Sequence, residues 1–299
     1  MDRISVNIAG IVFAISSDGF ESSIHLARAY EDFLSSDPPE ITIKIHNDGL
    51  PIIIYRDQDK IFDSEMVWSL YLINGQYVLT LKSPSSHHQP YRIAIFDEQF
   101  RHGDVYSNIP ETGLADLQIN PLEFPLSEVL MVCLLAQGRG LMVHACGVDD
   151  HGRGYLLTGN STHGKSTMAK LWQDEAAVLN DDRIVLRQMD GRFLMYGTPW
   201  HGDYSGVAPG GVPLEKIFYL RHANTNETIR KDGIAAASML LTRSFPPLWD
   251  GAGMLFTLDL CAHLVEAVPC FELGFVPDKD VLELMRNHLI QEDEELPFK

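Results

Sequence analysis

The chain has 299 residues, of which 45% are hydrophobic and 21% are charged, and its formal net charge is -18. Such a length suits two domains of a globular protein. The excess of 41 acidic over 23 basic residues argues against a nucleic-acid or anionic-membrane surface. No apolar run approaches the ~20 residues that cross a bilayer, and the four scattered cysteines form no disulfide framework or zinc motif. We therefore expect a cytoplasmic protein without nucleic-acid or membrane partners.

Residues 1–115 are rich in β-strand patterns. The apolar stretch 8–15 predicts a strand rather than a signal peptide. Asn74-Gly75 between two apolar runs predicts a type I′ hairpin, because both turn residues need positive φ. Residues 21–34 predict one short helix. We expect a small antiparallel sheet with no catalytic set, and its role stays open between substrate docking, oligomerisation and covering a second domain.

The polar residues 103–120 mark the boundary to a second domain, residues 116–299. Residues 125–137 predict a helix, with a proline near its start and a glycine just past its end. Residues 141–148 predict a strand, which the turn-rich segment 149–154 links to the next strand. A β-hairpin rather than a crossover helix therefore precedes the motif that follows.

A glycine-rich motif is the strongest signal in the chain. The segment from Gly159 to Ser166 fits the pattern G-x-x-x-x-G-K-[ST] at every fixed position, between an apolar strand and a helix. Backbone N–H groups and the helix dipole in such a loop hold phosphate. We predict a nucleotide site made by Gly159, Asn160, Ser161, Thr162, His163, Gly164, Lys165, Ser166 and Thr167. The alternative is an ordinary glycine turn between a strand and a helix.

Two adjacent carboxylates follow the next predicted strand, 176–179. Asp181 and Asp182 stand 16 and 17 residues after Lys165, and in P-loop proteins a carboxylate at a strand end holds the metal. Neighbouring residues point to opposite faces of an ideal strand, so both serve one site only if the strand ends there. One would then hold Mg²⁺ and the other would accept the proton of an attacking hydroxyl. The alternative is an Asp-Asp turn that caps the next element.

The remaining segments alternate between predicted strands and helices. We expect a flexible loop at 208–213, close to the glycine-rich motif. The predicted strands are 183–189, 192–196, 216–220 and 270–276, the predicted helices are 234–242, 253–266 and 280–288, and an acidic tail spans 292–295.

The order of these motifs resembles the C-terminal domain of HPr kinase/phosphorylase. His144 on a strand, a hairpin, the glycine-rich motif and Asp181-Asp182-Arg183 are also similar to related serine kinases and, more distantly, to phosphoenolpyruvate carboxykinase. The resemblance covers residues 125–290. It implies an α/β fold, in which a P-loop kinase domain follows a small β-rich (α+β) N-terminal domain.

The resemblance also implies an activity and residue roles. The expected activity is ATP- and Mg²⁺-dependent transfer of a phosphoryl group to a hydroxyl of a peptide, protein or small molecule, with serine as the first candidate. Ser166 and Asp181 would hold Mg²⁺. Lys165 would stabilise the transferred group, Asp182 would act as general base, and His144 would orient or modulate it. The first alternative is a nucleotide-binding regulatory protein without transfer activity. A carboxykinase-like enzyme ranks last, and a homo-oligomer is left open.

The sequence departs from the family pattern in three ways. Where the family has a metal-binding glutamate, Leu194-Met-Tyr196 precede Gly197, so Asp203 or water would replace it. The family's catalytic arginine has two candidates here, Arg221 and Arg243. A basic loop for a carrier protein is not evident. We therefore do not expect HPr as the substrate, nor a phosphorolysis activity.

Overall fold

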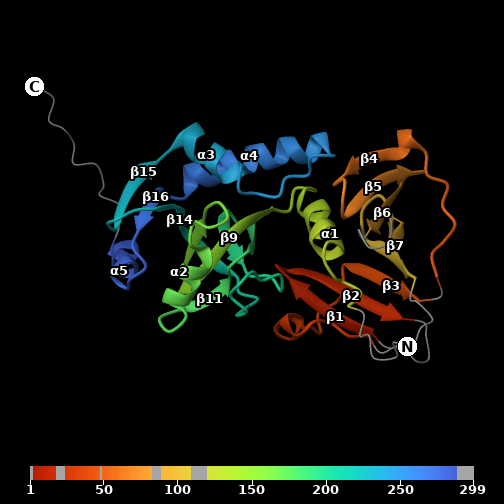
Figure 1. Ribbon diagram of the computed structural model, residues 1–299, viewed down its shortest axis with the longest axis horizontal. Coiled ribbons are helices and arrows are strands. Elements are labelled where there is room, and N and C mark those ends of the chain that lie inside the picture. Colours follow the sequence, from red (N-terminus) through yellow and green to blue (C-terminus); the bar gives the residue numbers. More distant parts are fainter. Residues whose placement is uncertain (1–2, 18–23, 48, 83–88, 109–119, 288–299) are drawn as a thin grey trace, which may run out of the picture.

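The computed structural model describes residues 3–17, 24–47, 49–82, 89–108 and 120–287. Two eight-stranded sheets follow one another along the long axis of the molecule (Figure 1). Helix α1 (Leu126–Leu135) lies between them. The architecture is therefore mixed α/β. The predicted boundary at 115/116 lies outside the described residues and stays a prediction, as does the acidic tail. No helix in the described part of the chain is long and apolar enough to cross a membrane.

The first sheet has the strand order β1-β2-β3-β8-β7-β6-β5-β4. The predicted hairpin is confirmed, since Asn74 and Gly75 have φ of 52° and 80° and join β5 to β6. The expectation of a purely antiparallel sheet is wrong, because β3 pairs in parallel with both β2 and β8. The strands are β1 (Arg3–Ile8), β2 (Ile11–Ser17), β3 (Ile41–His46), β4 (Lys60–Asp63), β5 (Trp68–Ile73), β6 (Gln76–Lys82), β7 (Pro90–Phe96) and β8 (His102–Ser107).

Two expectations about local structure in this half are corrected. Of the helix predicted over 21–34, residues 21–23 lie outside the described residues, and only Arg28–Phe33 forms a 3-10 helix, η1. Its two buried residues, Tyr30 and Phe33, are three apart, which is the spacing of one 3-10 face. Residues 103–107, predicted as boundary loop, belong to β8 because Val105 fits the alternating burial of a strand. A second 3-10 helix, η2 (Asp57–Asp59), precedes β4.

The second sheet has the path β10-β9-β12-β13-β14-β16-β15, with β11 beside β9. Because β10 also pairs in parallel with β14, five strands close into a ring. The predicted strands are present, and β15 is an addition that the sequence did not indicate. The strands are β9 (Leu141–Asp150), β10 (Arg153–Thr158), β11 (Ala177–Asn180), β12 (Arg183–Met189), β13 (Arg192–Tyr196), β14 (Val212–His222), β15 (Glu227–Lys231) and β16 (Cys270–Phe275).

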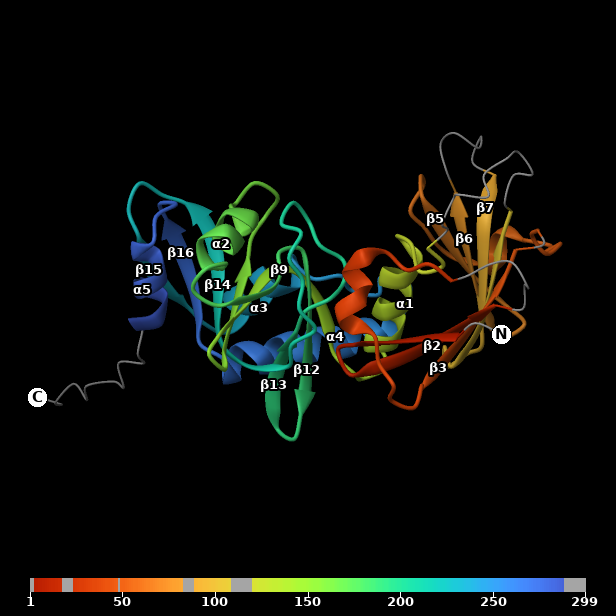
Figure 2. The same ribbon diagram turned by 90° about the horizontal axis from the view of Figure 1, so that it is seen from below.

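Helices flank the second sheet, and each pair has its own apolar core. Helices α3 (Gly233–Leu241) and α4 (Gly251–Ala267) pack on one core, through residues such as Leu240 and Leu264. Helices α2 (Lys165–Trp172) and α5 (Asp280–Asn287) pack on another, through Trp172 and Val281. Figures 1 and 2 show α4 reaching from this sheet towards α1.

The core of the first sheet extends into the second half of the chain. Helix α1 is buried on nearly every side, and Met142 of β9 and Val185 of β12 belong to the same cluster as the first sheet. Polar contacts add to this packing: Arg187 Nη1 donates to the carbonyl of Ala9 at 2.6 Å. One of the apolar cores therefore lies between the two sheets.

Helix α5 is fixed to the sheet by a buried carboxylate. The Asp150 side chain is fully buried, and it accepts hydrogen bonds from Arg286 at 3.1 Å and from Arg153 at 2.6 Å. Burial alone would raise the pKa of Asp150, but the hydrogen bond from Arg286 and the charges of both arginines hold the pKa below its ordinary value.

Asp150→Asn is therefore expected to destabilise the fold by about 1–3 kcal/mol at pH 7, because two arginines lose their counter-charge. A depressed pKa stabilises the folded state above the unfolded pKa of about 3.9, and this contribution is lost as the pH falls further. The difference from the wild type should thus shrink below about pH 4. Denaturant unfolding at pH 7 and pH 3 measures it, and an equal difference at both values would contradict the prediction.

Candidate functional site

The glycine-rich segment forms the connection from β10 to α2, with the predicted strand and helix on either side. Gly164 has a φ of 90°, and a Cβ there would lie 2.7 Å from Phe275 Cζ, so both conformation and space require glycine. Thr162 also has positive φ, at 77°. The ring nitrogen Nδ1 of His163 is 2.9 Å from the carbonyl oxygen of Leu220, which ties the loop to β14.

Lys165 is buried at the first position of α2. Its Nζ donates to the carbonyls of Gly159 and Asn160 at 3.0 and 3.3 Å. Burial lowers the pKa of Lys165, and the charges of Asp182 and Asp181 partly oppose that effect. The amine therefore lies over the loop, within the electrostatic reach of both carboxylates.

Asp181 contacts helix α2 at Ser166, the residue after Lys165. The Ser166 hydroxyl donates to Asp181 Oδ2 at 2.7 Å. Asp181 is only 2% exposed and also accepts from the backbone N–H groups of Gly202 at 2.7 Å and Tyr204 at 3.0 Å. The two residues predicted to share a metal are thus in direct contact.

Asp182 has different partners from Asp181 and forms an ion-paired group. His144 Nε2 lies 2.9 Å from one carboxylate oxygen, and Arg183 Nη1 lies 2.6 Å from the other. Burial alone would raise the pKa of Asp182, but the hydrogen bond from His144 and the charges of Arg183 and Lys165 lower it. The side chain is therefore a carboxylate at neutral pH.

Asn180, directly before the two aspartates, holds the turn that carries them, and it was not predicted from the sequence. Its fully buried side chain accepts from the N–H groups of Asp182 and Arg183 at 2.6 and 2.8 Å. It donates to the carbonyls of Thr198 and Trp200 at 2.8 and 3.1 Å. These bonds replace ladder bonds where β11 gives way to β12 along β9. An asparagine just before a polar pair at a strand end is the available sequence signal.

Asn180→Ala is expected to lower the free energy of unfolding by at least about 2 kcal/mol, since four backbone groups that are buried or half-buried lose their partner. Denaturant unfolding with an unchanged m-value measures this loss. Asn226→Ala is a matched control, because Asn226 bonds Val276 N and Asp278 at the surface. Equal losses of unfolding free energy in the two variants would contradict the prediction, because the Asn180 contacts would then stabilise the fold no more than those of Asn226.

The side chains of three further candidates, Asp203, Arg221 and Arg243, do not belong to this cluster. Asp203 is exposed, although its two neighbours donate to Asp181. The Arg221 guanidinium pairs with Glu272 at 2.8 Å and also with Glu227. Arg243 Nη1 donates to the carbonyl of Met239, and only the Arg243 carbonyl reaches the site, accepting from His144 N at 2.7 Å.

The 208–213 loop, predicted to be flexible, is hydrogen bonded to two neighbouring segments. Ala208 N donates to Leu179 O at 3.0 Å, and Gly197 N donates to Pro209 O at 3.1 Å. The strand β14 already begins at Val212. Within the described ranges, no group of three or more His, Cys, Asp or Glu side chains is arranged to hold a metal ion.

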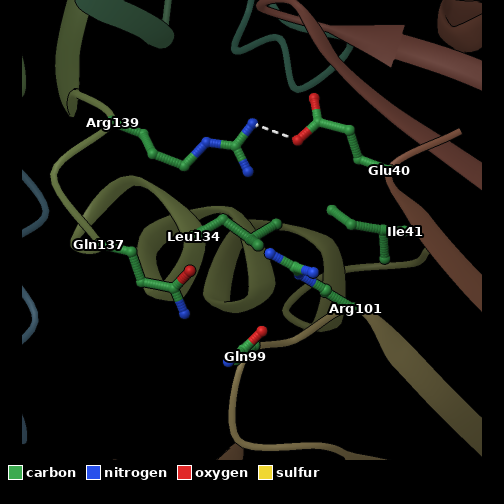
Figure 3. A pocket seen from close by; sticks show the side chains of 7 residues that line it. All are labelled: Glu40, Ile41, Gln99, Arg101, Leu134, Gln137 and Arg139. Atoms are coloured by element: carbon green, nitrogen blue, oxygen red, sulfur yellow. Dashed lines mark hydrogen bonds and ion pairs between the residues drawn. The ribbon is translucent and has the colours of Figure 1, made fainter.

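A polar pocket of about 480 Å³ lies away from these residues, between the end of α1, the start of β3 and the turn from β7 to β8 (Figure 3). Arg139 crosses its rim and donates to Glu40 at 2.7 Å. None of the predicted site residues lines it; the lining residues are Glu40, Ile41, Gln99, Arg101, Leu134, Gln137 and Arg139.

No family model and no curated protein sequence matches the chain. Among solved structures, the chain is similar to the HPr(Ser) kinase/phosphatase from Coxiella burnetii, with a TM-score of 0.32 and 13% sequence identity. The match covers 49% of this chain and 95% of that chain. At this TM-score and identity we draw no activity from the match.

Proposed function

We propose that the chain is an ATP- and Mg²⁺-dependent kinase that transfers the γ-phosphoryl group to an alcohol, with serine as the first candidate. Residues 116–299 would form the P-loop kinase domain, and residues 1–115 a β-rich domain before it. The observation that carries the proposal is the 2.7 Å contact between Ser166 and Asp181, next to an ion-paired Asp182. This juxtaposition puts a hydroxyl, two carboxylates and a buried amine at one helix N-terminus.

The donor set at Ser166 and Asp181 fits magnesium. A carboxylate and a hydroxyl oxygen are hard ligands, and Mg²⁺ in phosphoryl-transfer sites takes one or two carboxylates and completes its shell with water and phosphate. When bound, Mg²⁺ would neutralise charge on the nucleotide phosphates. The N–H groups of Gly202 and Tyr204 fix the Asp181 carboxylate beforehand.

The chain's own residues would position the phosphates and take up one proton. Backbone N–H groups of 159–167 and the Lys165 amine would hold the phosphate tail. The acceptor oxygen bonds to the γ-phosphorus, the bond from that phosphorus to the β–γ bridging oxygen breaks, and its electron pair leaves with ADP. The hydroxyl proton goes to Asp182. Because its pKa is lowered, Asp182 suits a late proton transfer rather than early deprotonation.

The proposal is tested by binding and by transfer. Calorimetric titration of ATP with and without Mg²⁺ should give tighter binding with the metal. Incubation with γ-labelled ATP should then place label on the hydroxyl of free serine, of serine peptides or of small alcohols. ATP binding without transfer to any of them would favour the second candidate, a nucleotide-binding regulatory protein.

A further inference from the structure

A second pocket, of about 350 Å³, borders the site between the two sheets. It draws its walls from β4 and β5 of the first sheet, from helix α1, and from the segment that precedes α4. The lining residues are Phe62, Trp68, Phe124, Pro125, Glu128, Val129, Val132, Met142, Arg183, Ser244, Phe245, Pro246, Leu248 and Trp249.

Arg183 connects this pocket to the proposed base. Its guanidinium lies 2.6 Å from Asp182 and 4.3 Å from the centre of the Phe245 ring, which is itself part of the wall. The charge of Asp182 also raises the pKa of Glu128 on α1. Asp182 itself does not line the pocket, and the Arg183 guanidinium joins the pocket wall to that carboxylate.

Glu128 contributes a carboxylate to the pocket wall. Its carboxylate accepts a hydrogen bond from Ser127 Oγ at 3.0 Å. The ion pairs among the described residues do not include Glu128, and Arg183 is already paired with Asp182. Burial raises the pKa of Glu128, and the hydrogen bonds from its own backbone N–H and from Ser127, together with the charge of Arg183, oppose that effect only in part.

Aromatic rings make up another part of the wall. Phe62 stacks on Trp68 with centroids 4.7 Å apart, and Trp249 meets both edge-on at 5.1 and 5.4 Å. Such rings bury an apolar body and attract a cation at their faces. The volume is at the lower end of the range for small-molecule sites, about 300–1,000 Å³. It suits a small molecule better than the surface of a folded protein.

We propose that this pocket binds the phosphoryl acceptor, and that the acceptor is a small amino alcohol. Its ammonium group would pair with Glu128, its apolar body would contact Trp68 and Trp249, and its hydroxyl would lie on the side of Arg183, which is paired with Asp182. The inference rests on the proposed kinase function. It also gives the first sheet a role, since Phe62 and Trp68 belong to that sheet.

The binding part is tested with 2-phenylethylamine, compared with neutral 2-phenylethanol and anionic 3-phenylpropanoate, by tryptophan fluorescence. The amine should bind most tightly. Glu128→Gln should weaken amine binding by about 10- to 100-fold and leave the alcohol unchanged. Glu266→Gln, on the surface of α4, is the matched control. Leu248→Trp, at a rim residue that is 65% exposed, should weaken both ligands and does not alter the core.

The transfer part compares phenylalaninol with 3-phenylpropan-1-ol as acceptors of label from ATP, with serine peptides alongside. Preference for the amino alcohol that Glu128→Gln removes would support the inference. Transfer to serine peptides, with amine binding unchanged in Glu128→Gln, would overturn the inference and keep the kinase. Glu128-dependent amine binding without transfer to any alcohol would overturn the kinase, and with it the acceptor role of the pocket.

Discussion

Replacing Asp182 with asparagine is expected to lower phosphoryl transfer by about 10²- to 10⁴-fold, the usual effect of removing a general base, while ATP binding is retained. Asparagine keeps the size of the side chain, and its amide oxygen can still accept a bond from His144 or Arg183. What it loses is the capacity to take the acceptor's proton. Binding should persist because the loop and Lys165, rather than Asp182, would hold the phosphates.

Single-turnover transfer from γ-labelled ATP, at enzyme in excess, isolates this step from product release. Asp190→Asn is the matched control, since Asp190 lies in the β12–β13 turn with a φ of 50°, which asparagine tolerates. Unchanged transfer in Asp182→Asn would place the base elsewhere. If neither the wild type nor the variant transfers label while both bind ATP, the chain is a nucleotide-binding regulator.

The second large effect is expected from Lys165→Ala, which should weaken ATP binding by about 10- to 100-fold. Without a nucleotide, the amine is bonded to two loop carbonyls and burial disfavours its charge. The charges of Asp182 and Asp181 oppose that effect only in part, and a phosphate would add a further opposite charge. Removing the amine therefore removes a charge-assisted contact in a partly desolvated place.

Calorimetric titration of ATP·Mg²⁺ measures this loss, and thermal unfolding checks that the variant folds. Lys170→Ala provides the control, because Lys170 is exposed on the same helix, α2. An ATP affinity that does not change in Lys165→Ala would rule out the glycine-rich loop as the phosphate site.

Local signals in the sequence predicted the elements around the site well. The Asn74-Gly75 hairpin follows from the need for positive φ at both turn residues, and it is present. The strand before the glycine-rich segment and the helix after it also form as predicted. These features depend on residues that are close together in the chain, so composition and spacing are sufficient to find them.

Features that depend on distant pairing were not predictable in this way. The parallel position of β3 between β2 and β8 is set by contacts across the sheet. The His144–Asp182 pair was expected only from the family resemblance, because it depends on the register of β9 and β12, where Arg183 stands opposite His144. The edge strand β15 was missed because it is largely exposed and carries charged residues, so its apolar pattern is weak.

The hydrogen bond from Trp200 Nε1 to the Tyr30 hydroxyl, 2.9 Å long, joins the two halves at the site itself. Tyr30 belongs to the first half, while the Trp200 carbonyl is held by Asn180, beside the two aspartates. A change at Tyr30 would therefore be transmitted to the carboxylates within a few bonds. The halves are therefore not interchangeable modules. Recombination that joined either half to a half from another protein would have to restore this contact, so we expect the two halves to be inherited together.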